Sequence, residues 1–131
     1  MPITFGWYNE AKHIWIQEFS NYWTMEEFWV AADEAYKAID AIAPHKFYII
    51  SDMTSSMRLP PGLLSATRSI LQRKRNNEAL HVLVGGGVII HSLYQMARPA
   101  TKQYLRLANT LEEALAMIDE AIAQDQVGSS G

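Results

Sequence analysis

A run of short polar side chains in the first half of the chain holds the groups best suited to bind a ligand or accept a phosphoryl group. Asp52, Thr54, Ser55 and Ser56 follow directly on the apolar stretch Phe47–Ile50. In open α/β sheets, binding sites form at the carboxyl ends of strands, so this junction is the first candidate site. The same side chains are typical of turns, where they accept hydrogen bonds from nearby backbone amides, and both interpretations stay open.

Basic side chains surround and follow this polar run. Arg58 lies at its end, and Arg68 and Arg73 belong to a predicted helix that begins near Pro61. The stretch Met53–Asn109 has eight basic residues and one acid, whereas the rest of the chain is acidic and the net charge is −3. This asymmetry indicates an anionic partner, a self-complementary contact, or helix faces whose charges neutralise one another. We expect the polar run and the helix after it to form a partner-binding face.

The chain lacks the residues and motifs that cysteine chemistry, metal binding, nucleophilic catalysis and phosphate-binding loops require. The chain has no cysteine, which excludes disulfides and thiolate nucleophiles. His13, His45, His81 and His91 do not have the spacing of metal ligands, and no nucleophile-elbow motif is present. The stretch Gly85–Gly87 lacks the spacing of a phosphate-binding loop and predicts a tight turn. We therefore expect no catalytic residues, no metal and no cofactor, and no nucleic-acid partner, because no aromatic residues interleave with the basic cluster.

The hydrophobic pattern predicts the elements that would position these residues. Alternation over residues 3–8 and 13–19 predicts an antiparallel hairpin. Amphipathic periodicity predicts four helices, and the first and last each begin with a capping box, at Thr24–Glu27 and Thr110–Glu113. The predicted order is ββαβαβαβα, with later strands at 47–51, 80–84 and 104–108 and helices at 24–43, 60–75, 88–98 and from 110 onward. Strands that alternate with helices pair in parallel, so the sequence predicts an α/β domain with a mixed five-stranded sheet.

Three features resemble a known family. These are the step Asp52-Met53-Thr54 after the central strand, the helix that follows it, and the closing segment Tyr104–Leu115. Together they are similar to the STAS domain of anti-sigma-factor antagonists. The chain looks closest to the SpoIIAA-like group, which shares its architecture with small lipid-binding CRAL-TRIO proteins. The resemblance extends from about Ile3 to Gln124 and implies a STAS-like fold and a non-enzymatic regulatory module that binds another protein.

The resemblance also implies a serine that can be phosphorylated at the start of the second helix, where a helix N-terminus favours a phosphate. In this chain that position holds the stretch Arg58–Gly62 instead. If the switch is retained, Ser55 or Ser56 is the candidate phosphoacceptor.

A second function is a small binding protein for a lipid or another apolar ligand. Aromatic residues are dense before residue 30, and they would line a pocket, form an interface or simply pack in the core. The third predicted helix is apolar over a wide arc, which favours either a homodimer contact or a flap over a pocket between this helix and the sheet.

The whole chain is expected to form one domain, residues 1–126, followed by a flexible tail at 127–131. No apolar run is long enough to cross a bilayer, and the N-terminus lacks the pattern of a signal peptide, so a cytoplasmic location is expected.

Overall fold

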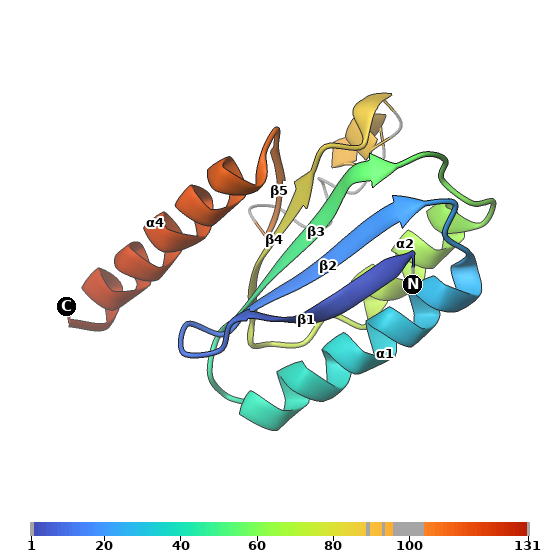
Figure 1. Cartoon of the computed structure of the whole chain (residues 1–131). Helices are drawn as coiled ribbons and strands as arrows, with labels where there is room; N and C mark the ends of the chain where they lie inside the picture. The colour runs from blue at the N-terminus through green and yellow to red at the C-terminus, as the bar shows by residue number, and fades with distance from the viewer. Residues whose placement is uncertain (1, 89, 93, 96–103, 131) are drawn as a thin grey trace.

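Five strands pair in the order in which they occur along the chain (Figure 1). The computed structural model describes residues 2–88, 90–92, 94, 95 and 104–130. Its strands are β1 (Ile3–Asn9), β2 (Ile14–Asn21), β3 (Phe47–Ser56), β4 (Glu78–Val84) and β5 (Leu105–Ala108). β1 is antiparallel to β2, and the other neighbouring pairs are parallel. The predicted α/β class and mixed five-stranded sheet are confirmed.

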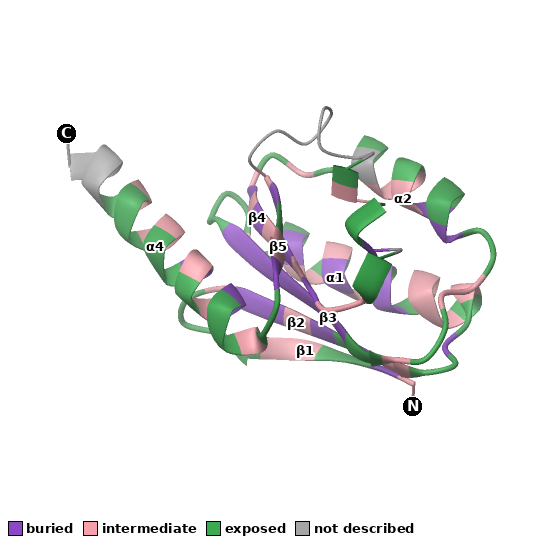
Figure 2. Ribbon diagram, turned by 90° about the horizontal axis from the view of Figure 1, so that it is seen from above, coloured by how far each residue is buried: buried purple, intermediate pink, exposed green. Residues whose placement is uncertain are grey.

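The helices cover both faces of this sheet. They are α1 (Met25–Ile42), α2 (Leu63–Gln72) and α4 (Leu111–Ser130), and the third predicted helix is described at residues 87, 88, 90–92, 94 and 95. Its predicted last residues, 96–98, lie outside the described part of the chain. α1 and α2 lie on one face and α4 on the other, and the central strands between them are largely buried (Figure 2). Successive right-handed crossovers in one direction across a sheet place their helices on one face, which accounts for α1 and α2.

Alternation along β4 divides the core between the two faces. Leu80, Val82 and Val84 are buried in the cluster that includes Ala114 and Ile118 of α4. The residues between them, at positions 81 and 83, point to the α1 and α2 face. Because side chains alternate along a strand, one short strand supplies both layers of the core.

The polar run predicted as a loop lies largely in a strand, which corrects the sequence analysis. β3 continues from Phe47 through Ser56, because β2 also continues and pairs Ser20 with Ser55 and Asn21 with Ser56. Local propensity favours a turn here, but the pairing of two neighbouring strands outweighs it.

The second helix is shorter than predicted. It begins at Leu63, after Gly62 in a left-handed conformation with φ of 91°, and ends at Gln72. Arg73 is therefore the C-cap residue, and Lys74 and Arg75 belong to the connection to β4.

Helix starts at Thr24 and Thr110 agree with the prediction. The Thr24 hydroxyl accepts from the amide of Glu27 at 3.2 Å, and the Glu27 carboxylate accepts from the amide of Thr24 at 3.1 Å, which completes the capping box. The backbone of α4 is helical through Ser130, so it includes part of the segment that the sequence analysis assigns to the tail. No helix in the described part of the chain is long and apolar enough to span a membrane.

Most of the early aromatic residues pack against one another. The Trp7 ring lies edge-on to Trp15 at 5.2 Å and tilted against Phe47 at 5.4 Å. Phe19 and Trp23 form a second group, with ring centroids 4.9 Å apart. These contacts fit the interpretation of the aromatics as core residues.

Candidate functional site

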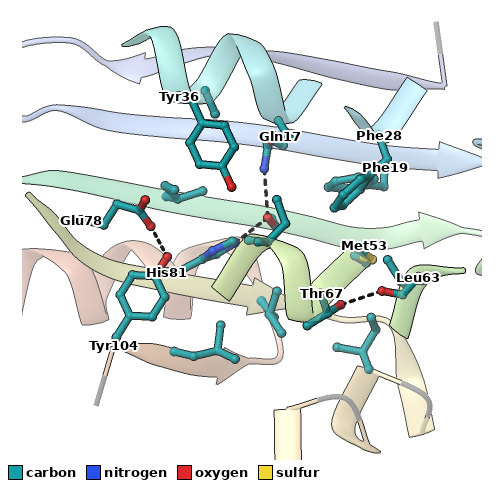
Figure 3. Close-up of a pocket in the computed structure, with 18 of the residues that line it drawn as sticks. Gln17, Phe19, Phe28, Tyr36, Met53, Leu63, Thr67, Glu78, His81 and Tyr104 are labelled. Carbon is teal, nitrogen blue, oxygen red and sulfur yellow. Dashed lines mark hydrogen bonds between the residues drawn. The ribbon is translucent and has the colours of Figure 1, made fainter. Parts of the chain in front are cut away.

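A partly open cavity of about 120 Å³ lies between the sheet and the helices α1 and α2 (Figure 3). Its walls come from β2, β3, β4, β5, both helices and Ile90 of the third helix. The cavity includes the place where the ligand-binding hypothesis put its pocket, between the third helix and the sheet. Residues of α1 and α2 also line it, which was not predicted from the sequence.

One end of the cavity is apolar. Phe19 and Phe28 lie side by side there, with Met53 and Leu63 close by (Figure 3). Ile90 belongs to the same cluster and is 1% exposed. Most of the surface at this end is hydrocarbon, ring or thioether. The Thr67 hydroxyl also lies here and donates to the backbone carbonyl of Leu63 at 2.8 Å.

The middle of the cavity holds a chain of hydrogen-bonded polar side chains. The amide nitrogen of Gln17 donates to the hydroxyl of Ser51 at 3.3 Å, and Ser51 Oγ lies 2.7 Å from Nε2 of His81. Gln17 and Ser51 are paired in the register of β2 and β3, and His81 is paired with the neighbouring Ile49. The sheet itself therefore brings these three side chains together, on the face opposite α4.

Burial keeps His81 neutral. It is partly buried on the cavity wall, and the resulting desolvation lowers its pKa from 6.5 to about 4. Nδ1 of the ring has no hydrogen-bonding partner among the described residues, whereas Nε2 contacts Ser51. The neutral ring therefore offers one nitrogen to a molecule in the cavity.

A second polar pair lies at the end of the cavity formed by the start of β4. The Tyr104 hydroxyl donates to one carboxylate oxygen of Glu78, and the backbone amide of Arg75 donates to the other at 2.9 Å. Burial first, and then the charge of Glu78, raise the pKa of Tyr104 well above 10, so this phenol stays protonated. Glu78 is 6% exposed, and both of its oxygens have a partner.

Tyr36 of α1 brings an unpartnered hydroxyl to this region. Its ring points toward His81 and Glu78 in Figure 3, and among the described residues its oxygen is buried without a hydrogen-bonding partner. Burial, followed by the charge of Glu78, raises its pKa to about 12. An unpaired buried hydroxyl costs ~1–3 kcal/mol of stability, so a molecule that pairs with Tyr36 would recover that energy on binding.

The basic connection between α2 and β4 lies over the aromatic rings at this end. The guanidinium of Arg73 is 5.2 Å from the Trp29 ring centre, and the Lys74 nitrogen is 4.8 Å from that of Tyr104. Arg75 lies 4.5 Å from the Tyr36 ring and bonds the Asp40 carboxylate through Nε at 3.0 Å. These cations have partners within the chain.

The predicted site residues of β3 form local contacts. Asp52 accepts from the backbone amide of Thr54 at 2.9 Å and from its hydroxyl at 2.6 Å. The Ser56 hydroxyl accepts from the indole nitrogen of Trp23 at 2.8 Å, and Ser55 is exposed. The contacts of Asp52 match the turn-like interpretation, and phosphorylation of Ser55 or Ser56 stays a prediction.

The predicted basic residues do not join this group. Arg58 and Arg68 are exposed, and Arg73 packs on Trp29. No hydrogen bond or ion pair within the described residues connects these three to Asp52 or to the serines. The partner face predicted from them therefore stays a prediction.

The polar residues of the cavity were not predicted from the sequence, although the strands that hold them carry a signal. Gln17, Ser51 and His81 are polar residues of three neighbouring strands, at positions that face the same side of the sheet. Such residues are buried only when partnered, so their coincidence on one face indicates a site. The strand register that brings them together is a property of the fold, and one sequence does not fix it.

The described residues contain no cluster of three or more histidine or acidic side chains able to hold a metal ion. A scan against protein-family models returns no match, and neither does a search of curated proteins or a search of solved structures. The resemblance to STAS domains therefore stays a prediction.

Proposed function

We propose that this protein binds a small, mainly apolar molecule in the cavity between the sheet and the α1 and α2 face. The proposal rests on one observation: the cavity has an apolar end and a polar region that includes the unpartnered Tyr36 hydroxyl. Apolar pockets with a few convergent polar groups are the usual form of small-molecule sites. His81 and Tyr36, with pKa values strongly shifted by burial, support the same site.

The cavity volume limits the size of the ligand. At about 120 Å³ it is somewhat smaller than the ~150 Å³ cavity that accepts benzene, and well below the ~300–1,000 Å³ of pockets for drug-sized molecules. The proposal is therefore a ligand of about six non-hydrogen atoms, and a lipid acyl chain exceeds the space that this structure offers.

Filling the cavity tests this proposal. Leu83 lies on the cavity wall and is only partly buried, so Leu83→Phe directs a larger side chain into the space. We expect calorimetry with cyclopentanol as probe to show binding to the wild-type protein and at least a tenfold weaker affinity for the variant.

The matched control is Leu64→Phe, the same substitution on an exposed residue of α2 that does not line the cavity. It should bind cyclopentanol like the wild type. Equal affinity for the wild type and Leu83→Phe, with circular dichroism showing that both are folded, would place the probe outside the cavity and refute the proposal.

The second candidate function is the regulatory interaction module that the STAS resemblance implies. One observation favours it: Tyr22 and Met57 are each 65% exposed, and a surface groove beside them is lined by Arg58, Pro60 and Pro61. Arg58 has no ion-pair partner among the described residues. An apolar surface next to such a cation suits a protein segment that carries an acidic side chain beside an apolar one.

Charge reversal at Arg58 tests this second candidate. Arg58→Glu should lower at least tenfold the amount of any partner that co-purifies from the native host, without changing the melting temperature. The control is Lys37→Glu on the exposed side of α1, which should leave recovery unchanged. Equal recovery with both variants would mean that the groove does not bind the partner.

A further inference from the structure

We propose that the ligand of the cavity is an uncharged molecule with a hydroxyl group, whose oxygen pairs with Tyr36 while its apolar part lies against Phe28 and Ile90. This inference rests on the function proposed above and adds the chemical class of the ligand. It follows from the charges and from the unpartnered polar atoms around the cavity.

The charges at the polar region disfavour an anion. The one carboxylate on the cavity wall is Glu78, and the described lining residues include no lysine or arginine. The guanidinium of Arg75 lies 4.5 Å from the Tyr36 ring and bonds Asp40, and the Lys74 nitrogen lies 4.8 Å from the Tyr104 ring. Neither cation lines the cavity. An anionic ligand would therefore lose its hydration and gain no opposite charge in return.

A cation is disfavoured for a different reason. Glu78 is the only negative group on the described wall, and its two oxygens already accept from Tyr104 and from the amide of Arg75. The neutral ring of His81 contributes no charge. An ammonium group would therefore be desolvated without a free carboxylate oxygen to receive it.

A hydroxyl matches the polar atoms that remain. The Tyr36 oxygen can both donate and accept, and Nδ1 of His81 has no partner among the described residues. A ligand hydroxyl likewise donates and accepts, so it can satisfy Tyr36 in either direction. A purely apolar ligand would fill the space but leave the Tyr36 hydroxyl buried and unpaired.

A series of probes of similar size tests the inference by calorimetry on the full chain. Cyclopentanol, methylcyclopentane and cyclopentylammonium differ only in one substituent, and cyclobutanecarboxylate supplies the anion. We expect cyclopentanol to bind about tenfold more tightly than methylcyclopentane, because it satisfies one buried hydroxyl. The two charged probes should bind more weakly than cyclopentanol.

The variant Tyr36→Phe tests whether the preference for cyclopentanol comes from the Tyr36 hydroxyl. This variant should bind methylcyclopentane as well as the wild type does and lose the tenfold preference for cyclopentanol. Because the lost hydroxyl has no partner among the described residues, the variant should also melt at an equal or higher temperature than the wild type.

The other outcomes separate the two proposals. Equal affinity for cyclopentanol and methylcyclopentane would overturn the hydroxyl ligand and leave the cavity as a binding site. A tightest complex with cyclopentylammonium or cyclobutanecarboxylate, or a preference that persists in Tyr36→Phe, would likewise overturn the ligand class. Binding of none of the four probes would overturn the proposed function itself.

Discussion

Between pH 7 and pH 4, the free energy of unfolding should fall by about 3 kcal/mol through His81 alone. The pKa of His81 is about 4 in the folded protein and about 6.5 in an unfolded chain, because burial removes the charged ring from water. In this pH range the unfolded chain therefore binds a proton that the folded protein does not. The stabilisation is complete above pH 6.5 and is lost as the pH falls toward 4.

Urea denaturation at several pH values measures this effect, and His81→Gln isolates it. Glutamine places an amide near the position of Nε2, so the contact with Ser51 is retained while the titrating group is removed. The variant should lose about 3 kcal/mol less stability than the wild type over this range. Parallel pH profiles for the two proteins would show that His81 does not titrate on unfolding, and therefore that it is not held neutral in the cavity.

Replacement of Gly86 by alanine should destabilise the protein by about 3 kcal/mol or more. Gly86 has a φ of 84°, and a Cβ atom at this residue would lie 2.1 Å from Cγ1 of Ile90. The left-handed conformation costs a non-glycine residue ~1–2 kcal/mol, and the collision requires a buried side chain to move as well. Because Ile90 lines the cavity, the affinity for cyclopentanol should fall together with the stability.

The neighbouring glycine supplies the control for this substitution. Gly87 is also left-handed, with φ of 63°, but a Cβ atom there would meet nothing within 4 Å. Gly87→Ala should therefore cost only the ~1–2 kcal/mol of the backbone conformation and leave probe binding intact. If the two variants had the same melting temperature and the same affinity, close packing between the glycine turn and Ile90 would not contribute to the site.

The local signals in the sequence predicted most of the architecture. The capping box at Thr24 and the alternation of the first two strands depend on neighbours in the chain, and both have the predicted form. The three glycines after β4 have left-handed backbone conformations, with φ of 71°, 84° and 63°, which glycine adopts most readily. Such features are readable because nearby residues alone determine them.

The polar run after Ile50 shows where prediction from local composition fails. Asp52, Thr54 and Ser55 have the composition of a turn, yet β3 continues because β2 pairs with it as far as Ser56. The same pairing turns Ser51 inward, toward Gln17 and His81, and away from the surface where the sequence analysis placed the site.

The residues of the cavity could not be predicted from the sequence for a related reason. Tyr36 lies in α1, Glu78 in β4 and Tyr104 just before β5, and only the tertiary fold brings them together. None of them belongs to a local motif that indicates a site. A site of this kind is defined by contacts between elements, which periodicity along one sequence does not report.

The most direct test of the account is to locate a bound probe by nuclear magnetic resonance. Intermolecular NOEs between cyclopentanol and the isotope-labelled protein identify the protons around the ring. We expect NOEs to Phe19, Phe28 and Ile90, and a shift of the Tyr36 ring resonances. NOEs confined to the groove beside Tyr22 and Pro60, or none at saturating cyclopentanol, would contradict the conclusion that the cavity is the binding site.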